Sequence, residues 1–437
     1  MKKLILCLAL TWIACQALAQ DNCLYFDRLI KKGNDLYQKG EYYYNQAVQK
    51  YTAALLACPN RAAEAQKAIA NVFEQVQKLK RQAEEAQENM RNTIQILAGN
   101  QDNYYRYFYQ KGEKAYQLGE YEDALNNFIF AGIANDKPTN NDIQKRIQNT
   151  EICLNAQNRA YALLQKAQYE AAEKEIAKAI QLNPQARRTL LIAAALNPAK
   201  YALAQLPAGE FMMGCDSTRD NNCNESELPR HNVRLDAFQM GQYEVTNLAY
   251  CVFLNRYNSD EVKEGAYKGQ TMIYEHAWGI VYDETLQQWR TQYPEYELHP
   301  VVYVTWYGAN EFCQYYGGSL PTEAQWEYAA RSAGKDNYIY VGSDDIDEVA
   351  WYNKTSKGTQ TFPVGLLKPN EKKLYDMSGN VWEWCLDWYD SRYYETSSKA
   401  IGGTVENPTG AVDGSYRVLR GGSWSYLAGL CRVAHRS

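Results

Sequence analysis

The sequence lacks a strong excess of charge of either sign. Lysine and arginine number 46 and aspartate and glutamate 51 in 437 residues, so the formal net charge at pH 7 is only −5. A nucleic-acid partner bound through bulk charge is therefore not expected, because such binding needs a clear basic surplus. Apolar residues make up 46% of the chain and charged residues 22%, which excludes a mainly disordered chain.

Long hydrophobic runs are also absent, apart from one at the N-terminus. Two lysines precede an apolar run that ends at Cys15, and the small residues Ala17 and Ala19 follow. This order is typical of a signal peptide, so we expect residues 1–19 to be removed and the rest to be periplasmic, cell-surface or secreted. Lipid attachment at Cys15 is the alternative. We expect no transmembrane span, because no other segment has the length and apolar character.

Metal-binding cysteine and histidine pairs of the CxxC or HExxH kind do not occur. Removal of the signal peptide leaves nine cysteines, and in an oxidising compartment some of them should pair. Cys215 and Cys223 flank a polar loop, 216–222, that a disulfide could close. The nine are Cys23, Cys58, Cys153, Cys215, Cys223, Cys251, Cys313, Cys385 and Cys431.

Glycine and tryptophan divide the chain into two halves. Only six of the 27 glycines precede residue 201, and apart from Trp12 every tryptophan lies at 278 or beyond. The shift predicts a helical region over residues 20–200 and a loop-rich domain over 205–437.

The helical half repeats one spacing of small and aromatic residues that resembles the tetratricopeptide pattern. Unrelated amphipathic hairpins are the alternative. Repeat arrays of this kind dock protein partners and carry no chemistry of their own. The first copy comprises Gly112, Gly119, Tyr121, Ala124, Phe128, Ala131 and Pro138; the second Tyr169, Ala172, Ile176, Ala179 and Pro184; the third Gly40, Tyr44, Ala47, Tyr51, Ala54 and Pro59.

Between the third and first copies, apolar residues alternate spacings of four and three. This pattern predicts a long helix near 61–98, either a coiled coil or a helix that packs along its own repeats. The apolar positions are Ala65, Ile69, Val72, Val76, Leu79, Ala83, Ala86 and Met90.

The C-terminal half predicts an α+β domain with much irregular backbone. Helices are expected at 307–316 and after Thr322, where Thr322 and Gln325 form a capping box. Strands are expected at 233–238, 301–305 and 417–419.

A series of blocks in this half resembles, in order, the formylglycine-generating enzyme or sulfatase-modifying factor family. The resemblance implies a variant of the C-type lectin fold, and thus a multidomain chain in which all-α helical repeats precede an α+β C-type lectin-like domain. Family members usually continue through a further segment, so we expect the domain to be truncated at its C-terminus. The blocks are 207–214, 229–233, 243–247, 299–302, 320–329, 376–384 and 417–424.

The family's oxidases hold Cu(I) between two cysteines that follow the Gly-Gly-Ser motif, because a soft ion prefers thiolates. Tyr426 stands at the first of these positions, which leaves only Cys431. The resemblance therefore argues against copper and against oxidase activity, and no catalytic residue is assigned. It also implies that Cys431 pairs with Cys313.

The family binds calcium in the segment that begins at Asp376. The resemblance implies that the side chains of Asp376 and Glu383 and the carbonyls of Gly379 and Val381 hold a structural calcium ion, which suits a hard ion. A hydrogen-bonded turn stacked by neighbouring tryptophans is the alternative.

The last residues also resemble variable proteins diversified by retroelements, which vary chosen positions of this domain. The resemblance implies an exposed ligand-binding surface in which aromatic side chains provide contact area. The positions are Trp424, Ser425, Tyr426, Leu427, Gly429, Leu430 and His435.

Other candidates for chemistry are weak. His231, His276 and His299 have no nucleophile partner in a known motif, and Glu323 and Glu327 lie one turn apart where they would brace a helix. The sequence therefore predicts an exported, non-catalytic ligand- or protein-binding member of the family. The alternatives are a formylglycine-generating oxidase that acts on sulfatase cysteines and an envelope scaffold of a secretion or gliding apparatus.

Overall fold

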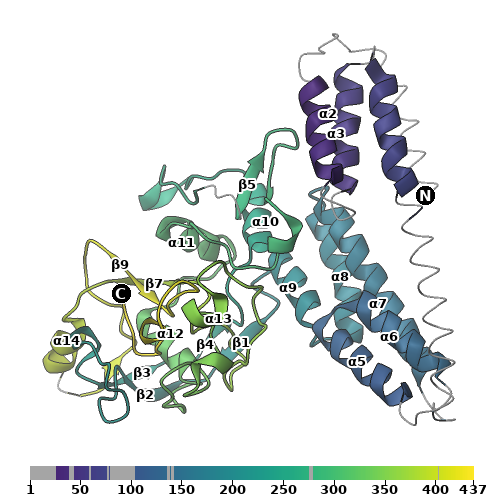
Figure 1. The fold of residues 1–437 in the computed structure, drawn as a ribbon. Coiled ribbons are helices and arrows are strands. Elements are labelled where there is room, and N and C mark those ends of the chain that lie inside the picture. Colours follow the sequence, from purple (N-terminus) through teal and green to yellow (C-terminus); the bar gives the residue numbers. More distant parts are fainter. Residues whose placement is uncertain are drawn as a thin grey trace. The chain divides into compact units, whose positions relative to one another are not determined.

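The computed structural model describes residues 26–38, 44–58, 61–75, 78, 104–134, 138, 142–274, 279–401 and 403–437 (Figure 1). The predicted signal peptide, Gly40, Pro59, His276 and residues 79–98 of the predicted long helix lie outside these ranges. The chain divides into two compact units, residues 1–105 with 133–137, and residues 106–132 with 138–437. Among the described residues, no helix combines the length and apolar character needed to cross a bilayer.

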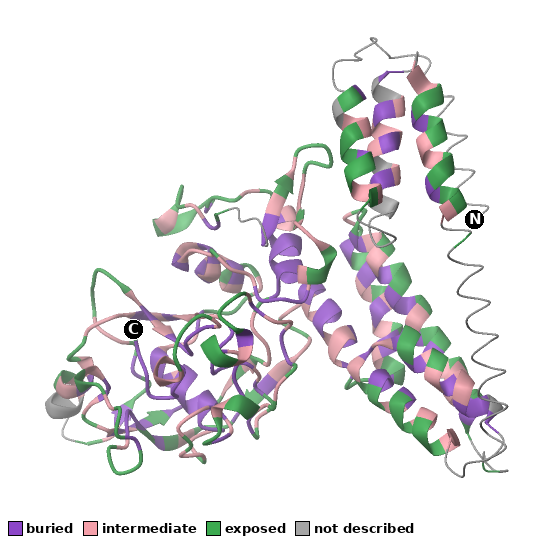
Figure 2. Ribbon diagram, viewed as in Figure 1, coloured by how far each residue is buried: buried purple, intermediate pink, exposed green. Residues whose placement is uncertain are grey.

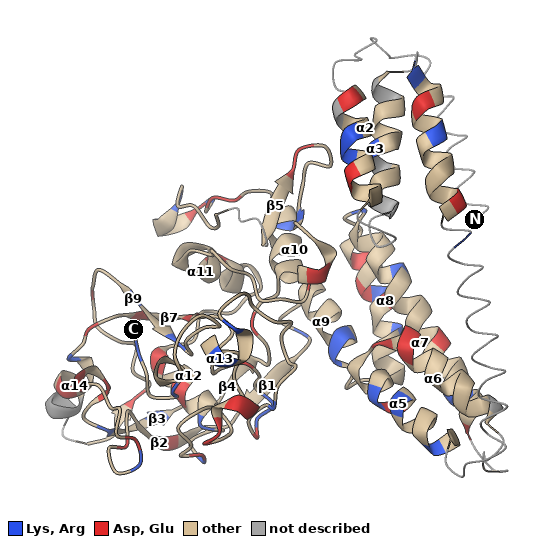
Figure 3. Ribbon diagram, viewed as in Figure 1, with Lys and Arg blue, Asp and Glu red and all other residues tan. Residues whose placement is uncertain are grey.

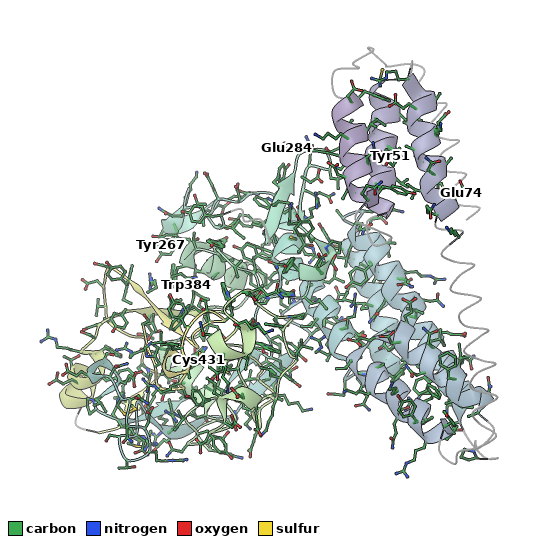
Figure 4. All side chains as sticks on the ribbon, viewed as in Figure 1. Tyr51, Glu74, Tyr267, Glu284, Trp384 and Cys431 are labelled. Carbon is green, nitrogen blue, oxygen red and sulfur yellow. A yellow bond between two sulfur atoms is a disulfide. The ribbon has the colours of Figure 1, made fainter. Side chains whose placement is uncertain are left out.

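The first unit contains a close pair of helices, α2 (Phe26–Gln38) and α3 (Tyr44–Ala57). Tyr51 of α3 is buried, and its side chain is labelled in Figure 4. A Cβ atom at Gly33 of α2 would lie 2.4 Å from the Tyr51 ring. Only glycine therefore allows this approach. Residues 62–75 are also helical, as the start of the predicted long helix requires.

The helical part of the second unit repeats this packing. Gly112 lies on helix α5 (Tyr104–Leu118) and Phe128 lies on helix α6 (Tyr121–Ile133). A Cβ atom at Gly112 would lie 2.6 Å from the Phe128 ring. The same pairing of a glycine with an aromatic ring thus supports the predicted repeat in both units. The helices are α5 (Tyr104–Leu118), α6 (Tyr121–Ile133), α7 (Ile143–Leu164), α8 (Tyr169–Leu182) and α9 (Arg187–Leu196).

Helix α10 (Asn247–Tyr257) joins these helices to the C-terminal domain through an apolar core. Its residues Leu248, Ala249 and Val252 belong to one buried cluster with Ile176 of α8 and Ile192 of α9. Figure 2 shows α10 as almost entirely buried. The helical region of the second unit is therefore packed against the domain and is not tethered by a bare linker.

In the described part of the C-terminal domain, short strands form four small sheets. The predicted strand at 417–419 is confirmed within β9, and that at 233–238 is divided between β3 and β4. The prediction at 301–305 was wrong: Val304 makes only an isolated bridge to Ile273. The sheets are β1 (Leu203–Leu206) with β4 (Phe238–Gly241); β2 (Gly209–Met213), β3 (His231–Leu235) and β8 (Val405–Glu406); β5 (Ile280–Asp283) with β6 (Gln288–Thr291); and β7 (Glu383–Trp388) with β9 (Arg417–Arg420).

The described residues of the domain also form four further helices, and the predicted capping box is confirmed. The Thr322 hydroxyl accepts from the amide of Gln325, whose side chain accepts from the amide of Thr322. The helices are α11 (Trp306–Tyr315), α12 (Glu323–Ala330), α13 (Asn353–Ser356) and α14 (Tyr393–Ile401), with 3-10 turns at Glu225–Glu227, Gly265–Tyr267, Pro294–Tyr296, Ile346–Glu348 and Ala428–Leu430.

Buried ion pairs fix α12 to the end of the chain, and Figure 3 shows the charged positions around this helix. Glu327 is buried and pairs with Arg331 at 2.9 Å and with Arg420. Glu323 accepts two hydrogen bonds from Arg436, each 2.7 Å long. Burial would raise the pKa of Glu327, but the two arginines hold it below its usual range. The two glutamates brace the helix, as their spacing predicts.

Candidate functional site

The segment that begins at Asp376 forms a tight turn whose backbone needs glycine. Gly379 has a φ of 83°, and a Cβ atom there would lie 2.3 Å from the carbonyl oxygen of Trp351. The amide of Asn380 donates to the same carbonyl at 2.7 Å. Because a side chain at position 379 would collide with that backbone, the turn is fixed in place against Trp351.

Three carboxylates gather around this turn. Asp376 is buried, and its Oδ2 atom accepts a hydrogen bond from the amide of Gly365 at 2.6 Å. Glu383 accepts from the indole nitrogen of Trp326 at 2.9 Å. The third carboxylate, Glu244, comes from a distant segment of the chain, and the charges of Asp376 and Glu383 act on it. The motif did not contain Glu244, and among the described residues these three carboxylates do not all lie within 4.8 Å of one another.

These carboxylates have little compensating charge. Burial raises the pKa of Asp376 to about 6 and, together with the charge of Asp376, that of Glu383 to about 7. Burial and then the charges of Asp376 and Glu383 raise the pKa of Glu244 well above its usual range. Arg187 is the basic side chain whose charge acts on Asp376. Buried charges of one sign call for a counter-ion.

The donor set fits a hard cation. The Oδ1 atom of Asp376 is buried and has no hydrogen-bond partner among the described residues. The lone pairs of this oxygen therefore remain available to a ligand. Carboxylate and backbone oxygens are what calcium prefers. The alternative is a hydrogen-bonded turn stacked by Trp382 and Trp384. The ring of Trp382 contacts those of Tyr426 and His435, and the indole of Trp384 donates to the carbonyl of Val304 at 3.1 Å.

The turn faces a cavity of about 880 Å³ in the second unit. A solute in this cavity could reach the carboxylates, because two of them lie in its wall. Figure 4 labels Trp384, whose ring borders the same space. The residues of the turn and its neighbours that line the cavity are Tyr243, Glu244, Val381, Trp382, Glu383 and Trp384.

The same turn supports the C-terminal segment. The amide of Trp424 donates to the carbonyl of Asn380 at 2.9 Å, and the amide of Gly379 donates to the carbonyl of Gly421 at 2.8 Å. The rings of Trp382 and Tyr426 meet edge to face, with centroids 5.6 Å apart. The predicted cation site and the predicted binding surface are therefore one continuous structure.

Most of the predicted surface positions are accessible. Ser425 is exposed, Tyr426 is 44% exposed and Leu427 is 72% exposed, while Trp424, Gly429 and Leu430 are half-buried.

His435 is the exception, and its assignment to an exposed surface was wrong. It is buried, and its ring lies 3.4 Å from a carboxylate oxygen of Glu227 and 5.9 Å from the ring of Trp382. The backbone turns inward after Cys431 because Arg432 makes buried ion pairs with Glu227.

The predicted Cys313–Cys431 disulfide was also wrong, since both are free thiols. Cys313 lies on α11 against the cluster around Phe253, whereas Cys431 packs with Ala350 and Tyr352. Burial raises the pKa of each thiol to about 12. Cys431, labelled in Figure 4, is therefore protonated at neutral pH and is a poor nucleophile or soft-metal ligand.

The predicted loop disulfide is confirmed. Cys215 and Cys223 are bonded, and their Cα atoms lie 5.7 Å apart. Cys58 is disulfide-bonded as well.

The described histidines have structural surroundings. His231 is buried against the ring of Tyr394, and His299 lies 2.9 Å from the hydroxyl of Thr361. Burial lowers the pKa of His299 to about 4, so it is neutral at physiological pH.

Sequence reasoning missed Glu244 as a member of the site. The residue belongs to the block at 243–247 that carries part of the resemblance, but it lies more than 130 residues before the turn. No spacing rule joins two such distant segments. The signal that could have found it is an acidic residue two positions before a helix cap, Thr246.

Comparison with known proteins identifies the domain. A family model described as "Sulfatase-modifying factor enzyme 1-like domain" matches residues 194–437. Formylglycine-generating enzyme of Streptomyces coelicolor is 32% identical over 272 residues, which cover 53% of this chain and 82% of that enzyme. Serine/threonine-protein kinase Pkn1 of Chlamydia trachomatis is 35% identical over 237 residues, which cover 53% of this chain. The matched residues make up only 34% of the kinase, so the chain spans about a third of that relative's length.

Other relatives include a protein whose name states that it is inactive. Inactive C-alpha-formylglycine-generating enzyme 2 of Bos taurus is 27% identical over 262 residues, which cover 51% of this chain and 76% of that protein. Among solved structures, PvdO from Pseudomonas aeruginosa matches with a TM-score of 0.42 and 21% identity, over 54% of this chain and 87% of that one. Treponema denticola variable protein 1 matches with a TM-score of 0.38 and 24% identity, over 54% and 88%.

Proposed function

Since the chain belongs to the sulfatase-modifying factor family, we propose that it is an exported, non-catalytic binding protein. Its lectin-like domain presents a binding surface that a calcium-held turn supports, and its helical repeats dock a second, protein partner. The observation that carries the proposal is the continuity between the turn and the surface: the amide of Trp424 bonds to the carbonyl of Asn380, and the rings of Tyr426 and Trp382 are in contact.

The chemistry of the surface suits binding. Tyr426 and Leu427 project from a backbone that the described hydrogen bonds already hold, since the amide of Asn353 donates to the carbonyl of Tyr426 at 3.0 Å. A large side chain on a fixed backbone gives contact area at small entropic cost. The ligand is therefore expected to be a protein or another surface ligand that these exposed side chains contact.

Calcium is the expected structural ion. Asp376 and Glu383 would hold it through their carboxylates, and Gly379 and Val381 through their carbonyls. When bound, the ion neutralises the acidic cluster and fixes the turn. This chain's own residues do the rest: Gly365 and Trp326 orient the two carboxylates by hydrogen bonds.

Export accords with the sulfur chemistry. The Cys215–Cys223 disulfide and the bonded Cys58 are typical of proteins from oxidising compartments. The predicted signal peptide gives the same expectation. The protein is thus proposed to act in the periplasm, at the cell surface or in the medium.

Formylglycine formation is the second candidate, because enzymes with that name are among the relatives. It would need a pair of accessible thiolates, whereas Tyr426 occupies one position and the Cys431 thiol is buried. Oxygen consumption with copper and a cysteine peptide from a sulfatase tests it. Turnover would overturn the non-catalytic proposal, and its absence at a copper excess is the expected result.

A photo-reactive amino acid at position 426 tests the binding surface in intact cells. We expect an adduct of defined mass that forms with calcium present and fails to form after chelation. The matched control is the same amino acid at position 416, because Tyr416 is 75% exposed and lies outside the surface. Adducts of equal yield at both positions, or none at 426, would count against the surface.

A further inference from the structure

We propose that the disulfide loop, residues 215–223, controls the surface at 424–430 in a redox-dependent way, and that it acts through Arg432. The inference rests on the proposed binding function and deepens it, because it adds a means of regulation to the same surface.

The disulfide loop holds Arg432 directly. Asp220 lies within the loop and is only 7% exposed, and its Oδ2 atom accepts from the Nη1 atom of Arg432 at 2.8 Å. The amide of Asn222 donates to Oδ1 at 2.9 Å, which orients the carboxylate. The Nη1 atom also lies 3.7 Å from the Sγ atom of Cys215. One guanidinium nitrogen thus contacts both the disulfide and an acidic side chain of the loop that it closes.

Arg432 in turn fixes the surface. Its Nε atom donates to the carbonyl of Gly429 at 2.9 Å, within the 3-10 turn Ala428–Leu430. Because the guanidinium is planar and rigid, the partners of its two Nη atoms also set the direction of Nε. The position of the Gly429 carbonyl therefore depends on the acidic groups at the opposite edge of the guanidinium.

Glu227 is the second acidic partner of Arg432 and lies outside the disulfide loop. It accepts from Nη1 at 2.9 Å and from Nη2 at 2.7 Å. The amide of Cys215 donates to the carbonyl of Glu227 at 3.1 Å, so this contact also adjoins the disulfide. Opening the loop should loosen Arg432 without releasing it completely, because Glu227 stays bound.

The disulfide is the anchor of the second half of the loop. Ion pairs hold the first half, since Asp216 pairs with Arg230 at 2.6 Å and Arg219 pairs with Asp344 at 2.9 Å. Residues 221–223 carry no charge, and the two asparagines among them are exposed. Cleavage of the bond at Cys223 should therefore free the side of the loop that follows Asp220.

The two sulfur atoms are placed for reversible cleavage. Cys223 is half-buried and Cys215 is buried, so an incoming thiolate reaches the sulfur of Cys223 first. That attack makes Cys215 the leaving group, and the charge of Arg432 beside it stabilises the departing thiolate.

A dithiol is the class of reductant that completes the exchange. Its second thiol displaces Cys223 from the mixed disulfide, so the dithiol becomes a cyclic disulfide while two electrons and two protons pass to Cys215 and Cys223. The Sγ atom of Cys215 lies 3.6 Å from the Oδ2 atom of Asp220, to which the new thiol can donate. Reduction therefore opens the loop and gives Asp220 a second donor that competes with Arg432.

Hydrogen exchange followed by mass spectrometry tests the inference on the full chain, with dithiothreitol as the reductant. The amides of Tyr426, Leu430 and Cys431 report on the surface, because each donates to a backbone carbonyl within 423–428. The amides of α10 report on the rest of the domain. The test variant is Cys215→Ser/Cys223→Ser, and Cys58→Ser is the matched control, since it breaks a different disulfide.

We expect the three surface amides to exchange about 10–100-fold faster in the reduced wild type and in the double serine variant. Exchange in α10 should stay the same, and Cys58→Ser should match the oxidised wild type at the surface amides. Asp220→Asn keeps the disulfide and should still speed exchange at the surface, because it weakens the contact with Arg432. Wild-type exchange in Asp220→Asn would overturn the route through Arg432.

Other results would overturn the inference as a whole. Unchanged surface amides after reduction would show that the disulfide does not control the surface. Equal acceleration in α10 would show that the disulfide only stabilises the whole domain. If the double serine variant does not fold, the reduced wild type gives the same decision, with α10 as its internal reference.

The photo-reactive amino acid at position 426 separates this inference from the proposed function. Its adduct should decrease in the double serine variant, and equal yields with and without the disulfide would overturn control of binding. If the amides respond but the oxidised protein forms no adduct, the proposed binding function is wrong and the link between the loop and the surface stands.

Discussion

The helical region and the C-terminal domain bury different kinds of side chain. The helix pairs meet through glycine against an aromatic ring, as at Gly112 and Phe128. The core of the C-terminal domain contains ion pairs instead, and Arg420 and Glu327 are both fully buried in it. The helical region is stabilised by close steric packing. The C-terminal domain is stabilised by packing together with buried ion pairs, in which each charge needs its partner.

This difference decides how each region responds to change. A steric contact between two helices is local and falls off within a few ångströms. A buried charge depends on every partner at once, because removal of one leaves the others uncompensated. Substitutions of similar size should therefore cost more in the C-terminal domain than in the helices.

The largest effect is expected at Glu327. Its carboxylate accepts from the amide of Gly214 at 2.9 Å and pairs with Arg331 and Arg420. Glu327→Gln should lower the free energy of unfolding by about 3–5 kcal/mol, because Arg331 loses its counter-charge and Arg420 keeps only its pair with Glu323. Chemical denaturation at neutral pH measures this loss.

The control for Glu327→Gln is Glu348→Gln, which removes an exposed ion pair with Lys368. It should leave the unfolding curve unchanged, since exposed pairs contribute little. Equal loss in both variants would show that burial is not what makes the ion pairs of Glu327 important for stability.

A smaller effect is expected from a methyl group in the helices. Gly112→Ala places a Cβ atom against the Phe128 ring and should destabilise the helical region by about 1–3 kcal/mol, despite the better helix propensity of alanine. Far-UV circular dichroism during denaturation follows the loss. The double variant Gly112→Ala/Phe128→Leu should recover much of it.

Gly429→Ala is the matched control, because no atom lies within 4 Å of a Cβ atom built there. If it destabilises the protein as much as Gly112→Ala, the close approach of the helices is not the cause. That result would contradict the conclusion that close steric packing stabilises the helical region.

Sequence reasoning succeeded where the determinants were local. The Gly112–Ala131 spacing predicted a helix pair, and Thr322 with Gln325 predicted a helix start to the residue, because both patterns lie within a few turns. The prediction of a strand at 301–305 failed because an apolar run in the sequence does not show whether a partner strand lies beside it in the fold.

The candidate site was predictable only in part. Asp376 and Glu383 lie in one motif, so their meeting follows from a single turn. Glu244 reaches the turn, where it bonds to Asn380 and Val381, only through the fold of the whole domain, and His435 is buried because Arg432 and Glu227 draw the last residues inward. Contacts between residues so far apart in the chain cannot be predicted from the spacing of residues within a motif.

The pH dependence of stability should distinguish the two regions where they join. Burial raises the pKa of Glu297 to about 7, with Arg188 of α9 and Tyr161 of α7 beside it. The folded chain therefore holds this proton more tightly than the unfolded chain does. The contribution of Glu297 to the free energy of unfolding should fall as the pH rises from about 4.5 to about 7, then level off.

Glu297→Gln should flatten that part of the curve of unfolding free energy against pH, and the difference from the wild type isolates Glu297 from other carboxylates. Glu295→Gln, at an exposed neighbouring position, should keep the wild-type slope. Denaturation midpoints at pH 5, 6 and 7.5 provide the measurement. Parallel curves for all three proteins would contradict the assignment.

The smallest effect on stability is expected at the surface that we propose binds a ligand. Tyr426→Ala removes a ring that is 44% exposed, while its backbone bonds to Asn353 and Ser423 remain. The free energy of unfolding should therefore change by no more than about 0.5 kcal/mol. A loss comparable to that of Gly112→Ala would mean that the ring is part of the core.

The same variant also tests what separates a binding surface from the core beneath it. Tyr426 contacts Trp382, which lies within the proposed calcium turn, and its own residue is 44% exposed. Tyr426→Ala should abolish the calcium-dependent adduct formed by a photo-reactive group placed at Leu427, with melting temperature preserved. If the variant loses binding but keeps its stability, the Tyr426 ring contributes to the binding surface and not to the buried core that the ion pairs hold.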